Sequence, residues 1–146
     1  MSTQDSNPVR AGKAGVAYFA LVLAAGFVFG SIRVPFLVPR VGERIAELIE
    51  TPFMFVVVVA AARFTARRYA LPTHGAPRLV AGFIGLAFLL AAEFALAAIL
   101  QQRSPGEFIT SRDPVAGTVF ALMLALFALM PFILGWLQSR RTHHVA

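Results

Sequence analysis

The sequence predicts an all-α integral membrane protein that folds as a four-helix bundle. The chain has 146 residues, of which 58% are hydrophobic and only 14% are charged, and its mean hydropathy is +0.75. A soluble domain is closer to half apolar and a quarter charged. The apolar residues fall in four long runs, and a helix needs about 20 such residues to cross a bilayer. The predicted spans are residues 14–32, 45–64, 79–100 and 115–137.

The first run, residues 14–32, contains no charged residue and no proline. Arg10 and Lys13 precede it, so a cleaved signal peptide is an alternative interpretation. The apolar run continues to Ile32, however, and is longer than the core of a usual signal peptide. We therefore expect a retained transmembrane helix.

The second run is interrupted by charge. Its purely apolar part, residues 53–62, is too short to cross a bilayer alone. A full span must begin near Ile45, which draws Glu47 and Glu50 into the membrane. The alternative is that residues 42–51 lie on the membrane surface and that the span is short or re-entrant. We expect the full span.

The third and fourth runs are long enough to span without such help. Residues 79–100 contain one charged side chain, Glu93, and residues 115–137 contain none, with Pro131 near their end. A carboxylate costs a few kcal/mol or more at such a depth, so Glu93 is expected to have a role.

Charge asymmetry predicts the orientation. With four spans, both termini and the middle loop share one side, which carries eight Arg and Lys residues against one acid, while the other side carries five Arg and three acids. Positive charge is kept on the cytoplasmic side. We therefore predict one transmembrane domain, residues 1–146, with cytoplasmic tails at 1–13 and 138–146, the latter basic. The abundance of Arg and Ala favours a bacterial inner membrane.

The acids of the spans predict a polar cluster. Glu43, Glu47 and Glu50 have the spacing i, i+4, i+7 and share one face of a helix. Glu50 and Glu93 lie about 8 and 10 Å below the outer ends of their predicted helices at 1.5 Å per residue. Arg33 marks the outer end of the first helix, so it lies at a similar level.

We predict that Arg33, Glu47, Glu50 and Glu93 form a buried binding cluster in the outer half of the bundle. Arg33 would supply a permanent charge and a fixed fork of donors. Glu93, the deepest acid, could carry a proton because desolvation disfavours its charged form. The alternative is that these residues only lock the helices together, through contacts worth about 1 kcal/mol each.

The connection between the first two spans, residues 33–44, is rich in proline and apolar side chains. It is either a lid that dips into the interface over the cluster or a tight connection packed on the bundle. Other Arg residues flank the spans, where lipid head groups lie. Candidate head-group contacts are Arg40, Arg44, Arg67 and Arg68.

Several classes of function are disfavoured by residue type. The net charge of +6 does not indicate nucleic acid, because the basic residues flank apolar runs instead of forming one patch. The chain has no Cys, which excludes disulfides and thiolate metal sites. The three His residues lie outside the spans, so we expect no haem held between helices. A Mg²⁺ or Ca²⁺ site on the glutamates is disfavoured because Arg33 competes for the same oxygens.

The sequence therefore identifies no catalytic set, metal or cofactor, and it does not decide whether the protein is an enzyme. The leading expectation is an accessory, assembly or interaction subunit of the inner membrane, surrounded by the lipid bilayer and bound to a membrane-protein partner or to further copies of itself. One alternative is a small oligomeric proton-coupled transporter that uses Glu93. Another is a membrane-embedded protein or enzyme that binds a lipid through Arg33 and Arg40.

Overall fold

The computed structural model describes residues 7–73, 75–102 and 104–143, and the described chain is all-α. Four long helices and three short helical segments follow one another along the sequence. They are α1 (Asn7–Ile32), the π-helix η1 (Arg33–Leu37), α2 (Val38–Val41), α3 (Glu43–Arg68), α4 (Ala76–Gln101), α5 (Pro105–Thr110) and α6 (Pro114–His143).

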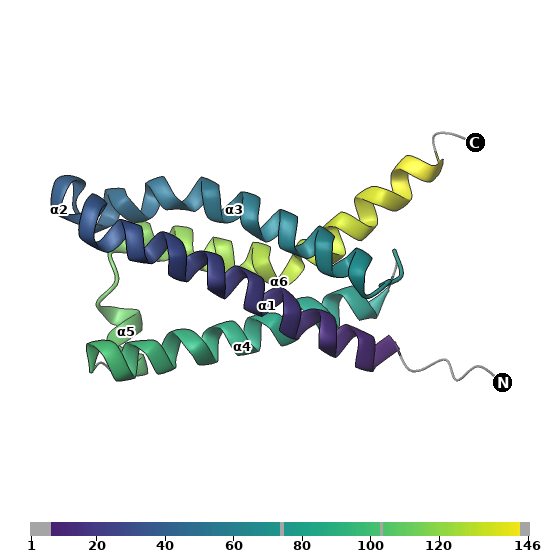
Figure 1. The fold of residues 1–146 in the computed structure, drawn as a ribbon, viewed down its shortest axis with the longest axis horizontal. Helices are drawn as coiled ribbons and strands as arrows, with labels where there is room; N and C mark the ends of the chain where they lie inside the picture. The colour runs from purple at the N-terminus through teal and green to yellow at the C-terminus, as the bar shows by residue number, and fades with distance from the viewer. Residues whose placement is uncertain (1–6, 74, 103, 144–146) are drawn as a thin grey trace.

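The long helices run alternately up and down along one axis (Figure 1). α1 packs against α3 and α4, and α6 packs against the same two helices, so the four close into a bundle. The start of α1 and the end of α6 lie at one end of this bundle, together with the end of α3 and the start of α4. We call this the terminal end. η1, α2 and α5 lie at the opposite end, which we call the α2–α5 end.

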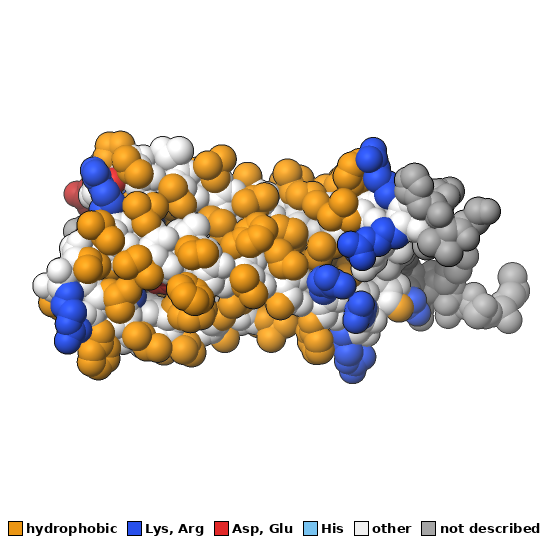
Figure 2. All heavy atoms as spheres, turned by 90° about the horizontal axis from the view of Figure 1, so that it is seen from above, with side chains coloured by type: hydrophobic (Ala, Val, Ile, Leu, Met, Phe, Trp, Pro, Cys, Tyr) orange, Lys and Arg blue, Asp and Glu red, His pale blue; other side chains and the backbone are white. Residues whose placement is uncertain are grey.

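All four long helices are long and apolar enough to cross a membrane, so the protein is a multi-pass membrane protein. Apolar side chains cover the length of the bundle between two charged ends, as Figure 2 shows. The most exposed include Ile99, at 75%, and Phe27, at 69%, which is expected where the surroundings are lipid. The predicted all-α four-helix bundle is confirmed, and the second run forms one continuous helix, Glu43–Arg68, that is long and apolar enough to span.

The helices extend beyond the predicted spans. α1 begins at Asn7 and not at residue 14, and α6 continues to His143, past the expected end at 137. The first candidate span even runs from Pro8 through η1 and α2 to Val41. Hydropathy marks only the apolar part of a helix, whereas its hydrogen bonds continue into the head-group region, where Arg and Lys side chains can reach water.

The segment expected as either a lid over the cluster or a tight connection is helical. Pro35 and Pro39 lack the N–H groups that an α-helix needs at their positions. The chain widens instead into the π-helix η1, in which the N–H of Val38 donates to the carbonyl of Arg33. The turn then ends at Gly42, whose φ of 81° suits glycine. This segment is therefore a tight helical connection from α1 to α3.

Glycines set the closest helix contacts, and these lie on α1 and α4. A Cβ at Gly82 would lie 1.9 Å from the backbone oxygen of Ala128 on α6. One at Gly15 would lie 2.7 Å from the backbone oxygen of Ala81 on α4. By contrast, Gly30 of the GxxxG pattern in α1 has no neighbour within 4 Å of its Cβ position. Close approach of helices thus occurs where α4 meets α1 and α6.

The apolar core centres on Tyr18, which is fully buried and stacks on Phe127 with ring centroids 4.2 Å apart. The hydroxyl of Tyr18 donates to the backbone carbonyl of Phe127 at 2.9 Å. Pro131 lies one turn later in α6 and has no N–H to donate to that carbonyl. Tyr18 therefore satisfies an acceptor that proline leaves free within an apolar core.

Candidate functional site

Arg33 joins the α1–η1 junction to α3 at the α2–α5 end. Its Nη1 lies 3.1 Å from Oε1 of Glu47, and its Nε lies 2.9 Å from Oε2 of Glu50. The Nε and Oε2 atoms have no hydrogen-bond partner in the described chain, so their contact is a Coulombic one without hydrogen-bond alignment. The three side chains are 18–24% exposed. Arg33 thus lies between two carboxylates that stand one turn apart on α3.

Arg112, in the link between α5 and α6, is a second cation of this cluster. Its Nη1 lies 4.0 Å from the same Glu47 oxygen that faces Arg33. Its guanidinium carbon lies 3.9 Å from the centroid of the Phe120 ring, a geometry in which the ring face attracts the cation. In the sequence, Arg112 is one of the five Arg residues predicted on the outer side. Its position two residues before α6 placed it at the level of Arg33, which was the available signal.

A further ion pair fastens the same end. Arg44 of α3 pairs with Asp113, in the link before α6. Oδ1 of Asp113 also accepts hydrogen bonds from the backbone N–H groups of Val115 and Ala116, which caps the start of α6. The hydrogen bond from Arg44, and then that from Ala116, hold the pKa of the Asp113 carboxyl below its usual value.

Glu93 lies on α4 and is half-buried. Within the described chain it makes no ion pair at 4.0 Å or less. The charges that act on it are those of Arg112 and Arg33, which attract it, and Glu47, which repels it. It lies about 12 Å from the end of α4 at 1.5 Å per residue. Glu93 is therefore close enough to feel the charges of the cluster but forms no ion pair with it among the described residues.

The charges of this site do not balance. We define the α2–α5 cluster as Arg33, Glu47, Glu50, Glu93 and Arg112. Three carboxylates face two guanidiniums, so the fully ionised cluster carries one net negative charge. The unpaired carboxylate is Glu93. An uncompensated charge is costly in an apolar medium, so a proton or a cation is favoured there.

The remaining predicted residues lie outside the cluster. Glu43, on the same face of α3, is exposed and makes no ion pair in the described chain. Arg40 is exposed, and its Nη1 donates to the carbonyl of Phe36 at 2.6 Å. Arg67 and Arg68 are exposed at the terminal end. Head-group contacts of these Arg residues and of Arg44, which pairs with Asp113, stay predictions.

Arg78 is a buried residue, although the sequence predicts it only as one of the eight basic residues on the side of the termini and middle loop. It is 4% exposed, near the start of α4. Its guanidinium donates to the carbonyls of Pro72 at 2.7 Å and Pro131 at 3.2 Å, and to the side-chain oxygen of Gln138 at 3.3 Å. It therefore ties the connection at 69–75 to α6. Its place in a proline-rich stretch gave no signal that it would turn inward.

In the part of the chain that the structure describes, no group of three or more His, Cys, Asp or Glu side chains gathers as metal ligands would. No family model, curated protein or solved structure matches this chain. The geometry of the α2–α5 cluster is thus the basis for a functional proposal.

Proposed function

We propose that this protein is a small proton-coupled carrier in which Glu93 is the carboxyl that exchanges a proton. The observation that carries the proposal is the charge imbalance of the α2–α5 cluster. Arg33 forms ion pairs with Glu47 and Glu50, and Arg112 lies beside Glu47. Glu93 lacks an ion pair in the described chain. A carboxylate left over within a membrane is favoured in its protonated form or beside a cation.

The way the helices are joined supports movement at this end. The ion pairs of the described residues link the α1–η1 junction, α3 and the start of α6, and none of them includes α4. α4 is held instead by close backbone contacts at Gly82 and Gly85, away from Glu93. The helix that carries Glu93 is thus the one that ion pairs leave unfastened at the α2–α5 end.

The proposed cycle follows from the charges. With Glu93 protonated, the cluster is neutral, and α4 can pack against the other helices without an uncompensated charge. When the proton leaves, a cationic group can take its place beside the carboxylate. Proton and cation would therefore compete for one site, as exchange transport requires. Further copies of the chain would complete the pathway, since one bundle of four helices is small for a carrier.

The first experiment tests the protonation of Glu93. Infrared difference spectra of the protein in lipid films should show a carboxylic-acid carbonyl band at neutral pH. This band should be lost in Glu93→Gln and retained in Glu43→Gln, because Glu43 is exposed and outside the cluster. If the band is absent from the natural protein, or survives in Glu93→Gln, Glu93 is not the proton carrier.

The second experiment tests transport with a defined probe. Proteoliposomes with an imposed pH gradient should accumulate the lipophilic cation ethidium, and Glu93→Gln should abolish this uptake. The Glu43→Gln variant is the matched control, with the same loss of charge at an exposed position of α3. Uptake by Glu93→Gln at the natural rate would contradict the proposal, provided both variants elute as the natural protein does.

An accessory or assembly subunit is the second candidate. The observation that favours it is that the ion pairs of Arg33, Arg44 and Arg112 connect helix ends, as they would in a cluster that only fixes the fold. This function predicts that a second membrane protein co-purifies in mild detergent. Native mass spectrometry of the protein in its own lipid should then show a complex with that partner. A homo-oligomer without a partner would favour the carrier.

We further propose a bacterial inner membrane with both termini in the cytoplasm. Among the described residues, the terminal end carries basic side chains and no acid, whereas the α2–α5 end carries all six described acids. Positive charge is retained on the cytoplasmic side. A reporter enzyme that is active only outside the cytoplasm should be inactive when fused to the C-terminus. The basic residues of the terminal end are Arg10, Lys13, Arg63, Arg67, Arg68, Arg78, Arg140 and Arg141.

A further inference from the structure

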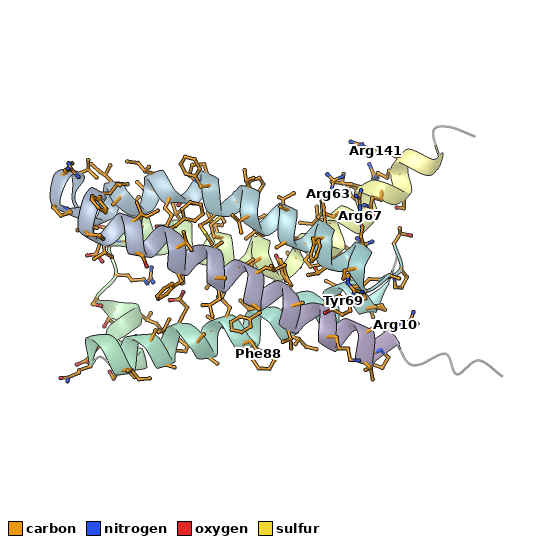
Figure 3. The ribbon with its side chains drawn as sticks, viewed as in Figure 1. Arg10, Arg63, Arg67, Tyr69, Phe88 and Arg141 are labelled. Atoms are coloured by element: carbon orange, nitrogen blue, oxygen red, sulfur yellow. The ribbon has the colours of Figure 1, made fainter. Side chains whose placement is uncertain are left out.

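A shallow depression on the surface of α3 lies at the terminal end, far from the cluster of acids. It is lined by Ala60, Arg63, Phe64, Arg67 and Arg68. The other four residues follow Ala60 by three, four, seven and eight positions, so all five share one face of the helix. Arg63 and Arg67 are labelled at this end in Figure 3. Both are exposed, so their guanidiniums are accessible from the membrane surface.

The charges of this face are uncompensated within the described chain. Among residues 7–73, 75–102 and 104–143, no acidic residue lies at the terminal end, and no ion pair includes Arg63, Arg67 or Arg68. Like charges four residues apart on a helix repel each other. The buried Arg78, near the start of α4, is a further cation of the terminal end and uses its donors on backbone carbonyls and Gln138. An anion seated between Arg63 and Arg67 would relieve this repulsion.

An apolar strip continues from the depression toward the middle of the membrane. Phe53 is 56% exposed, Val56 is 64% exposed and Phe64 is 57% exposed, and Ala60 lies exposed between them. They follow one another at three or four residues along α3, so they form a continuous row on its outer face. The row ends at the guanidiniums of Arg63 and Arg67. A charged group and a hydrocarbon chain can thus be bound on the same face.

We propose that this face of α3 is a binding site for an anionic phospholipid. The phosphate group lies between Arg63 and Arg67, which offer paired donors of fixed geometry, and Arg68 stands beside them. One acyl chain lies along Phe64, Ala60 and Val56. The site is independent of Glu93 and of the carrier function, because it occupies the opposite end of the bundle.

Native mass spectrometry tests the site on the full-length protein, taken from vesicles with equal amounts of phosphatidylglycerol and phosphatidylcholine. The natural protein should retain phosphatidylglycerol preferentially. In the double variant Arg63→Gln/Arg67→Gln, retention of phosphatidylglycerol should fall by about tenfold or more. The reason is that each basic residue near the surface contributes on the order of a few-fold to anionic lipid binding. The control is Arg10→Gln/Lys13→Gln, which removes the same charge from exposed positions of α1 at the same end.

The control variant should keep most of the preference for phosphatidylglycerol. Equal losses in the two double variants would show diffuse attraction and overturn the proposal, as would undiminished retention by Arg63→Gln/Arg67→Gln. Competition by soluble glycerol phosphate as strong as that by the lipid would also overturn it, because the apolar strip would then contribute nothing. All four substituted residues are exposed, so size-exclusion profiles and circular dichroism should match the natural protein and exclude misfolding as the cause.

Discussion

Replacement of Tyr18 by Phe tests how the core satisfies the carbonyl that Pro131 leaves free. The substitution removes one oxygen atom and keeps the ring, which stacks on Phe127 at an angle of 9°. The backbone carbonyl of Phe127 would then lose the hydroxyl donor that now lies at 2.9 Å. The N–H of residue 131 cannot replace it, because a proline stands there.

The expected cost follows from the site being buried and apolar. An unmet buried hydrogen-bonding group costs about 1–3 kcal/mol, whereas polar contacts between membrane helices average about 0.6 and reach about 1.7 kcal/mol. We therefore expect Tyr18→Phe to destabilise the protein by about 1–2 kcal/mol. In a Pro131→Ala background the new N–H can donate to Phe127. The same substitution should then cost less than about 0.5 kcal/mol.

The assay is a double-mutant cycle, with unfolding in mixed detergent micelles followed by circular dichroism. The expected coupling between Tyr18 and Pro131 is about 1 kcal/mol. Tyr69→Phe serves as the control, because its hydroxyl makes no hydrogen bond within the described chain. A cost of Tyr18→Phe that is the same with proline and with alanine at position 131 would refute this account of the core.

Three further predictions use the same unfolding measurement. Gly82→Ala should cost at least about 2 kcal/mol, because the new Cβ would overlap a backbone oxygen of α6. Gly30→Ala should change stability by less than about 0.5 kcal/mol, because its Cβ position has no neighbour within 4 Å. Similar effects of the two substitutions would contradict the assigned helix contact. Arg33→Gln should cost about 2 kcal/mol, since it leaves two partly buried carboxylates without their nearest cation, and a neutral result would show that the cluster is not ionised. Arg44 lowers the pKa of Asp113 in the folded protein, so Asp113→Asn should destabilise the folded protein at pH values above the unfolded-state pKa of about 3.9. This effect should vanish as the pH falls through the lower folded-state pKa. An effect independent of pH would indicate that only the cap geometry matters.

The sequence alone determined the class of the protein and the number of its spans. Apolar runs of about 20 residues have one stable arrangement in a bilayer, because every backbone polar group must be hydrogen-bonded within its own helix. The same constraint predicted one long second helix, since residues 53–62 were too short to span alone, and the structure shows a continuous helix over Glu43–Arg68. Helical spacing then placed Glu47 and Glu50 on one face, where the structure shows both beside Arg33.

Only the tertiary structure decided which charges pair and which helices touch. Whether Arg33 faces α3 or α4 depends on how α1 rotates against its neighbours, and hydropathy carries no information on that angle in helices that are apolar on all sides. For the same reason the structure, and not the sequence, showed Arg112 beside Glu47 and turned Arg78 into the core. Gly30 and Gly82 both stand in apolar runs, but only Gly82 meets another backbone. Packing between helices decides which side chains pair, whereas each helix and the bilayer decide which residues span the membrane and how deep they lie.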